Sequence, residues 1–342
     1  MTGTTERRHD HAARDPRRRR TWILVAVLVS VGLVAARSFT ESSGVSLPDR
    51  LQDLVTLSAS VLIESLPFVI LGIVLSIVVQ VFVPDSVIMR VLPRNGALRR
   101  LVLSLFGIGL PVCECGNVPL ARGLVMKGLT VPESMTFLLA APIVNPITII
   151  TTHQAFGFDD GILVARILGG IAIANLVGWL FSRHPAQHEL ITPGFAAACE
   201  RPHGPQAGEP RWRSAVDVFT RETSVIMPAL FVGALLAGAI QVAVPRNVLV
   251  ALGSDPIWSV LAMMLLAFVI SICSSVDAFF ILPFASVFLP GSIVAFLVFG
   301  PIIDIKMLAI LRTTFPTRVL VQLSVVVALA SALIGAAVNV FA

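Results

Sequence analysis

Nine apolar stretches, most of them long enough to cross a bilayer, limit what this chain can fold into. A transmembrane helix needs about 20 consecutive apolar residues. Charged residues make up only 13% of the chain, against about 25% in soluble domains. The sequence therefore predicts an all-α, polytopic transmembrane helical bundle of about 8–9 spans, with the lipid bilayer around it. The stretches lie at residues 21–36, 54–83, 98–120, 133–153, 161–181, 219–244, 256–276, 291–311 and 318–341.

The N-terminal segment, residues 1–20, is basic and ends in four consecutive arginines. Because Lys and Arg are enriched on the cytoplasmic side, we expect residues 1–20 to be a basic cytoplasmic tail. Residues 21–40 are then a first transmembrane span in the cell (plasma) membrane. A cleaved signal peptide has a similar pattern and stays an alternative, since Ala35 and Ala36 resemble a cleavage site. No interleaving of aromatic and basic residues follows, so the pattern does not indicate a nucleic-acid partner.

The eight remaining stretches resemble a duplication of a four-segment unit. Membrane repeat 1 covers residues 54–182, a hydrophilic linker covers 183–213, and membrane repeat 2 covers 214–342. Chance similarity among Leu- and Val-rich segments is the alternative. Internal repeats with Gly/Pro-interrupted segments at corresponding places indicate a binding site between the repeats. An offset of 161, later 159, aligns Pro67 with Pro228, Gly72 with Gly233, Gln80 with Gln241, Pro142 with Pro301 and Asn145 with Asp304.

The orientation of the linker has two solutions. Four basic residues between 90 and 100 follow the second span and indicate a cytoplasmic loop. Four full spans per repeat would then place the linker outside, although its own arginines favour the cytoplasm. If one segment in each repeat is re-entrant, the linker moves inside and the repeats become inverted. The sequence leaves both solutions open.

The sharpest motif is residues 109–119, Gly-Leu-Pro-Val-Cys-Glu-Cys-Gly-Asn-Val-Pro. Its two prolines and two glycines predict a broken helix, and irregular backbone at membrane depth is tolerated only in protein or beside water. An acid inside a membrane segment is a functional candidate by default. The alternative is a pair of small buried cysteines at a helix end, with the acid solvated. The candidate substrate-binding residues here are Cys113, Glu114, Cys115, Asn117 and Pro119.

The second repeat carries a polar run, residues 271–277, at the corresponding place. Such a run needs partners, because unpaired polar groups in hydrocarbon are costly. It adds Cys273 and Asp277 as candidate site residues. Cys113, Cys115 and Cys273 together would suit a soft species such as trivalent arsenic or a soft metal ion. We therefore expect these three thiols to be metal or substrate ligands, and we expect no cofactor.

A second pair of breaks places Asn145 and Asp304 after prolines in matching segments. Proline frees backbone carbonyls that can line a path. Asp304 is either a proton-coupling group or half of an ion pair with Lys306, and both interpretations stay open. Arg122 and Lys127 are interpreted most simply as residues that reach to the membrane surface.

Residues 111–120, followed by Phe-Leu-Leu-Ala-Ala-Pro at 137–142 and Asn-Pro at 145–146, resemble a family of predicted bacterial permeases. This ArsP-like or YraQ-like family includes organoarsenical efflux permeases. The resemblance implies secondary transport, with a small-molecule or soft-metal substrate and a possible second membrane protein as partner. Glu114 between the two cysteines departs from the family pattern, which leaves the cargo open.

The leading hypothesis is a secondary-transport permease, not an enzyme, that exports a small solute such as an organoarsenical or a soft-metal species. One alternative is a membrane subunit that acts with a partner protein and docks through the linker. A further alternative is a membrane thiol–disulfide enzyme that uses Cys113 and Cys115, although redox pairs more typically have the spacing Cys-x-x-Cys. No nucleotide-binding loop of the form G-x-x-x-x-G-K-[ST] occurs.

Overall fold

A computed structural model describes residues 49–158, 161–200, 210–243 and 256–341. The basic tail and the expected first span lie outside these residues. The described chain is all helical, which confirms the all-α polytopic bundle. Two shorter apolar helices, Trp258–Ile270 and Pro290–Phe299, accompany five that are long enough to span a membrane. The five are Arg50–Phe82, Val131–Phe156, Ile162–Ser182, Arg211–Ala243 and Thr317–Val340.

The helices fall into two halves with the same order of elements, separated by the linker. The first half contains α2 (Asp49–Ile77), a π-helical turn (Val78–Phe82), α3 (Asp85–Val91), α4 (Gly96–Leu105), a 3-10 turn (Phe106–Gly109), α5 (Glu114–Met126), α6 (Val131–Val144), α7 (Pro146–Phe156) and α8 (Ile162–Ser182). The linker contains a 3-10 turn (Gln187–Leu190) and α9 (Pro193–Cys199). The second half contains α10 (Arg211–Ala243), α12 (Pro256–Ile270), α13 (Asp277–Ile281), a 3-10 turn (Leu282–Phe284), α14 (Pro290–Phe299), α15 (Ile305–Leu311) and α16 (Thr317–Phe341).

The apolar stretch at 98–120 does not form one span. α4 runs alongside α6 in the same direction, because Arg99 pairs with Glu133 near both starts and Gly107 packs on Ala141 further along. After the break, α5 runs alongside α2, where Ser76 donates to the carbonyl of Pro119. α4 therefore starts, and α5 ends, at the end of the molecule where α2 finishes. We call α4, the break and α5 hairpin 1.

The stretch at 256–276 is also interrupted. α12 and α14 start side by side, with the hydroxyls of Ser259 and Ser292 2.7 Å apart. The chain breaks at Ser271, whose φ of 52° lies in the left-handed region. α13 then leads back toward the start of α14. We call α12, the break and α13 hairpin 2.

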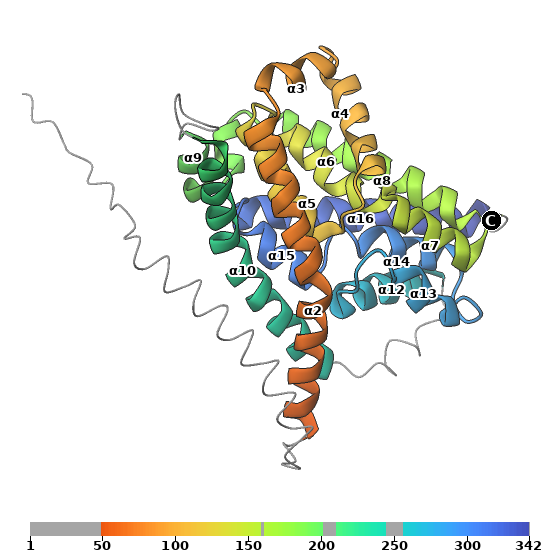
Figure 1. Ribbon diagram of the computed structural model, residues 1–342. Helices are drawn as coiled ribbons and strands as arrows, with labels where there is room; N and C mark the ends of the chain where they lie inside the picture. The colour runs from red at the N-terminus through yellow and green to blue at the C-terminus, as the bar shows by residue number, and fades with distance from the viewer. Residues whose placement is uncertain (1–48, 159–160, 201–209, 244–255, 342) are drawn as a thin grey trace, which may run out of the picture.

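The two halves run in opposite directions. α2 and α10 pack against each other antiparallel, because Gly238 lies on Ser58 at one end and Arg221 donates to Gln80 at the other. Hairpin 1 therefore enters from the end that carries α9, which we call the linker end. Hairpin 2 enters from the opposite end, which carries α7, α13 and the C-terminus and is called the far end (Figure 1). This is the re-entrant, inverted solution of the two that the sequence allows.

The linker is not a loose connection at its centre. Leu190 and Phe195 are buried, and the backbone N–H of Thr192 donates to the carbonyl of Thr314 in the turn between α15 and α16. Cys199 is half-buried, and this burial raises the pKa of its thiol. The middle of the linker is therefore packed onto the linker end of the bundle.

Candidate functional site

The broken ends of both hairpins meet inside the bundle. Cys113 precedes α5, and the neighbouring Val112 carbonyl accepts a hydrogen bond of 2.9 Å from the amide of Asn145. The hydroxyls of Thr148 and Ser274 lie 3.4 Å apart and join α7 to the tip of hairpin 2. Four chain breaks, two from each half, are thus collected in one buried region.

Acidic and amide side chains stand at the starts of the helices that leave these breaks. Glu114 and Asp277 are the first residues of α5 and α13. Asn145 and Asp304 are N-caps, accepting from the N–H groups of Ile147 and Met307 respectively. Because unpaired N–H groups and the helix dipole make an N-terminus partly positive, Glu114 and Asp277 bring negative charge to the positive ends of their helices, and Asn145 and Asp304 also satisfy backbone N–H groups. Capping alone gives Asn145 and Asp304 a structural role.

Glu114 lies in the centre of the region and is completely buried. Its carboxylate lies 3.1 Å from the ammonium of Lys306, and it also accepts from the hydroxyl of Ser274 at 3.3 Å and the thiol of Cys273 at 3.6 Å. Lys306 is itself 1% exposed, and its ammonium lies 3.9 Å from Asp304. A charge-assisted pair of this kind is stable at depth only when both charges keep their partners.

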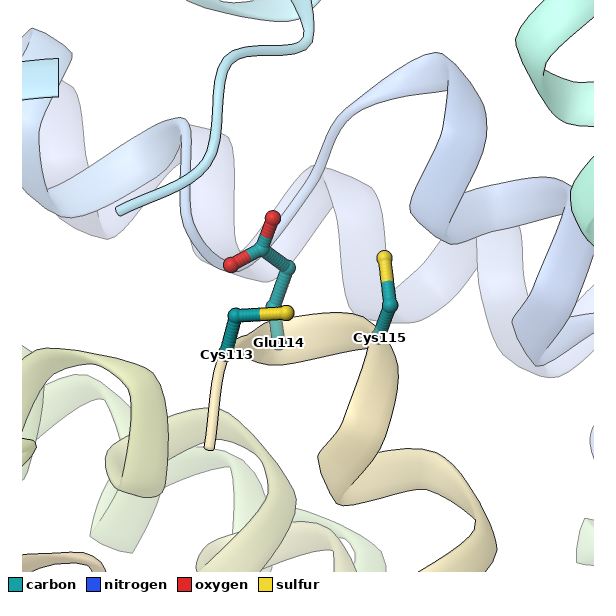
Figure 2. A group of neighbouring side chains, drawn as sticks. All are labelled: Cys113, Glu114 and Cys115. Carbon is teal, nitrogen blue, oxygen red and sulfur yellow. The ribbon is translucent and has the colours of Figure 1, made fainter. Parts of the chain in front are cut away.

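The three cysteines named from the sequence lie around Glu114. The thiols of Cys113 and Cys115 and the carboxylate of Glu114 all lie within 4.8 Å of one another. Figure 2 shows these side chains rising from the first turn of α5 to the same side of the ribbon. The Cys113 thiol lies beside those of Cys115 and Cys273, and none of the three is in a disulfide. The two hairpin tips therefore form one three-thiol cluster.

Asn117 and Pro119 differ in how they relate to this cluster. Asn117 is fully buried one turn beyond Cys113, and neither of its polar side-chain atoms has a hydrogen-bond partner among the described residues. Such a group is rare unless something outside the chain completes it. Pro119, in contrast, has its carbonyl occupied by Ser76. The Asn117 amide is therefore unsatisfied, whereas Pro119 fixes α5 on α2.

Asp277 lies apart from the thiols, in a buried pair with Arg166 of α8. The guanidinium makes two contacts with the carboxylate, of 3.0 and 2.5 Å, and a third with the hydroxyl of Thr152 at 2.7 Å. The sequence interpretation missed Arg166. The available signal was a single charged residue inside the apolar stretch 161–181.

Two further charged residues correct the sequence interpretation. Arg122 is 3% exposed, so its interpretation as a residue that reaches to the membrane surface is wrong. Its guanidinium binds Glu222 of α10 at 2.8 Å. Glu64 of α2, which was not singled out, is half-buried and accepts a hydrogen bond from the backbone of Cys273. Partners so distant in sequence left no local pattern to read.

A family model of predicted permeases, ArsP_1, matches residues 50–340. The chain belongs to this permease family. It is 37% identical over 282 residues to the YcgR protein of Bacillus subtilis, covering 80% of this chain and 94% of that protein. It is 31% identical to a Streptococcus mutans protein described as a "two-component membrane permease complex subunit", covering 81% and 91%. YraQ of Escherichia coli is 23% identical, covering 78% and 75%. No solved structure matches the chain significantly.

The broken helices of both halves bring several polar groups together. They place thiols, a carboxylate, an ammonium and an unsatisfied amide in one buried region. Three fully buried ion pairs of the described residues join the two halves: Glu114 with Lys306, Arg122 with Glu222, and Arg166 with Asp277. A further buried pair, Lys306 with Asp304, lies within the second half.

Proposed function

We propose that this permease moves a small thiophilic solute across the cell membrane by secondary transport, and that the solute binds between the hairpin tips. The observation that carries the proposal is the cluster of Cys113, Cys115 and Cys273 around the Glu114–Lys306 pair. It is supported by the family and by the inverted hairpins, whose tips bring both halves to one site.

The chemistry of the cluster favours trivalent arsenic or a soft metal ion. Thiolates are the ligands these species prefer, and hard ions such as magnesium prefer oxygen. The Lys306 ammonium supplies a positive charge beside the place where thiolates form on binding. Asn117 offers a donor and an acceptor to hydroxyl or water ligands of the bound species. An organoarsenical or a soft-metal species is therefore the cargo that we propose.

Charge asymmetry supports an orientation with the linker end in the cytoplasm. Basic residues gather in the turns at that end. At the far end the structure describes Arg50, which is exposed, and Arg166, which is buried in its pair with Asp277. Because basic loops are retained in the cytoplasm, we infer that the far end faces outward. A first span at 21–40 then leaves the N-terminus in the cytoplasm, and the proposed direction of transport is export. The basic residues of the linker end include Arg90, Arg94, Arg99, Arg183, Arg211, Arg213, Arg312 and Arg318.

A panel of toxic arsenicals and soft-metal salts, given to a host that lacks its own exporters, tests this proposal. The chain is expected to restore growth against one class, and a Cys113→Ser/Cys115→Ser/Cys273→Ser variant is expected to lose the effect. Cys199→Ser is the matched control, since that thiol lies in the linker. Binding of a trivalent arylarsenical to the purified chain should follow the same pattern. Full protection and binding by the triple variant would rule out the thiol site.

A subunit of a two-component permease is the second candidate, because the Streptococcus mutans relative carries that description. It predicts that the chain alone protects against no class, while co-expression with the genomic partner restores protection. Deletion of an exposed part of the linker would then abolish protection without loss of membrane insertion.

A further inference from the structure

Two of the buried ion pairs lie on either side of the central site. Arg122 lies two turns beyond Glu114 on α5, which runs toward the linker end, and its partner Glu222 lies in the first half of α10. Arg166 near the start of α8 and Asp277 at the start of α13 lie toward the far end. A solute that leaves the centre therefore meets one pair in each direction.

The pair toward the linker end fastens four separate elements. Besides Glu222, the Arg122 guanidinium reaches the Thr314 hydroxyl at 3.0 Å and the Thr313 carbonyl at 3.4 Å, in the turn between α15 and α16. It also lies 4.3 Å from the centre of the Phe195 ring in the linker. One side chain thus holds hairpin 1, α10, the α15–α16 turn and the linker together over the central site.

α2 and α10 pack against their neighbours near the linker end, and the described residues show no equivalent substantial packing near the far end. α2 packs along α5, and α10 packs along α15, both on the linker-end side. If each helix is replaced by the equivalent helix of the other half, these two contacts become α10 on α13 and α2 on α7. Among the described residues, neither counterpart is a substantial packing contact. The linker-end side is therefore closed by α2 and α10 in a way that the far-end side is not.

We propose that Arg122 and Glu222 form the gate that closes the path on the linker side. The alternative state exchanges the packing, so that α2 and α10 move from α5 and α15 onto α13 and α7. In that motion α10 carries Glu222 away from Arg122, whereas Arg166 and Asp277 lie on elements that need not separate. The inference rests on the proposed function for the identity of the path, but the closure itself is measurable without any cargo.

The rate at which the three central cysteines react with a thiol reagent measures whether the linker side of the path is closed. In a Cys199→Ser background, Cys113, Cys115 and Cys273 are buried, and a charged, membrane-impermeant thiol reagent should label them slowly. Glu222→Gln removes the charge that holds Arg122 and should raise labelling from the linker end about tenfold or more, a population shift of about 1.4 kcal/mol. Labelling from the far end should not rise. Glu189→Cys and Ser286→Cys, exposed at the linker end and far end, identify the labelled side in vesicles.

The matched control is Asp277→Asn, which breaks an equally buried arginine–carboxylate pair between the halves. It should leave labelling from the linker end unchanged. The exchange variant Arg122→Glu with Glu222→Arg should restore slow labelling, which a merely destabilised chain would not do. If Glu222→Gln fails to fold, Glu222→Asp replaces it in the experiment. This variant keeps the charge but shortens the side chain, so its labelling should be faster than that of the unchanged chain by less than about tenfold.

Slow labelling of a folded Glu222→Gln chain, equal acceleration from both ends, or the same acceleration in Asp277→Asn would each overturn the gate. The growth panel gives a separate answer. A chain that protects against no arsenical or metal but opens on the linker side upon Glu222→Gln refutes the cargo and keeps the gate. A chain that protects against one class but does not open on the linker side upon Glu222→Gln supports the proposed cargo and refutes the gate.

Discussion

At the scale of single residues, Glu114 and Lys306 are buried because each one neutralises the other. Asp304 is the other carboxylate paired with the ammonium among the described residues, at 3.9 Å, and it is already the cap of α15. Removing one partner of a buried pair typically costs about 3–5 kcal/mol, whereas replacing both with apolar groups is often neutral. Substitution of one or both partners therefore measures how much the stability of the fold depends on this pair.

Glu114→Gln is expected to lower the free energy of unfolding in detergent by about 3–5 kcal/mol. Combining Glu114→Leu and Lys306→Met with Asp304→Asn should recover most of that loss, because no buried charge is left unpaired and an amide can still cap α15. Arg99→Gln is the control, since it breaks a partly exposed pair with Glu133 and should cost about 1 kcal/mol or less. Equal losses in Arg99→Gln and Glu114→Gln would contradict the central role of the pair.

At the scale of the helix, hairpin 1 is held by close backbone approach to α2. A Cβ on Gly72 would lie 2.0 Å from the carbonyl oxygen of Gly116, which no rotamer can relieve. Gly72→Ala is therefore expected to separate the helices and reduce the yield of folded, monodisperse protein. Gly109→Ala, in the break of hairpin 1, is the control, because a Cβ there meets nothing within 4 Å. Normal folding of Gly72→Ala would show that the contact with α2 is looser than described.

The elements also show what the sequence could and could not predict. Proline and glycine around Cys113 marked a broken segment because both residues act locally on the backbone. Whether the stretch at 98–120 crosses the membrane or turns back inside it is decided by its packing on α6 and α2, which hydropathy does not contain. Arg122 and Glu222 lie 100 positions apart, so their pairing left no spacing to recognise.

At the scale of the whole molecule, the number of membrane crossings in the second half determines whether the linker and the C-terminus lie on the same side of the membrane. One re-entrant hairpin and three crossings place the C-terminus on the side opposite the linker, whereas four crossings would place both on the same side. Reporter fusions at Ala342 and at Gln187 are expected to show opposite sides of the membrane. Reporters on the same side would contradict the inverted arrangement and with it the meeting of the hairpin tips.

The pairing of charges between the halves also bears on the order in which the chain is made. Glu114, Arg122 and Arg166 are synthesised with the first half, and their partners follow about 100 to 190 residues later. An arginine costs about 2.5–3.5 kcal/mol during insertion at the centre of a membrane segment, and Arg166 near the start of α8 costs less, because its side chain can reach toward the membrane surface until its partner arrives. The three charged residues of the first half therefore lack their ion-pair partners until the second half has been synthesised and inserted.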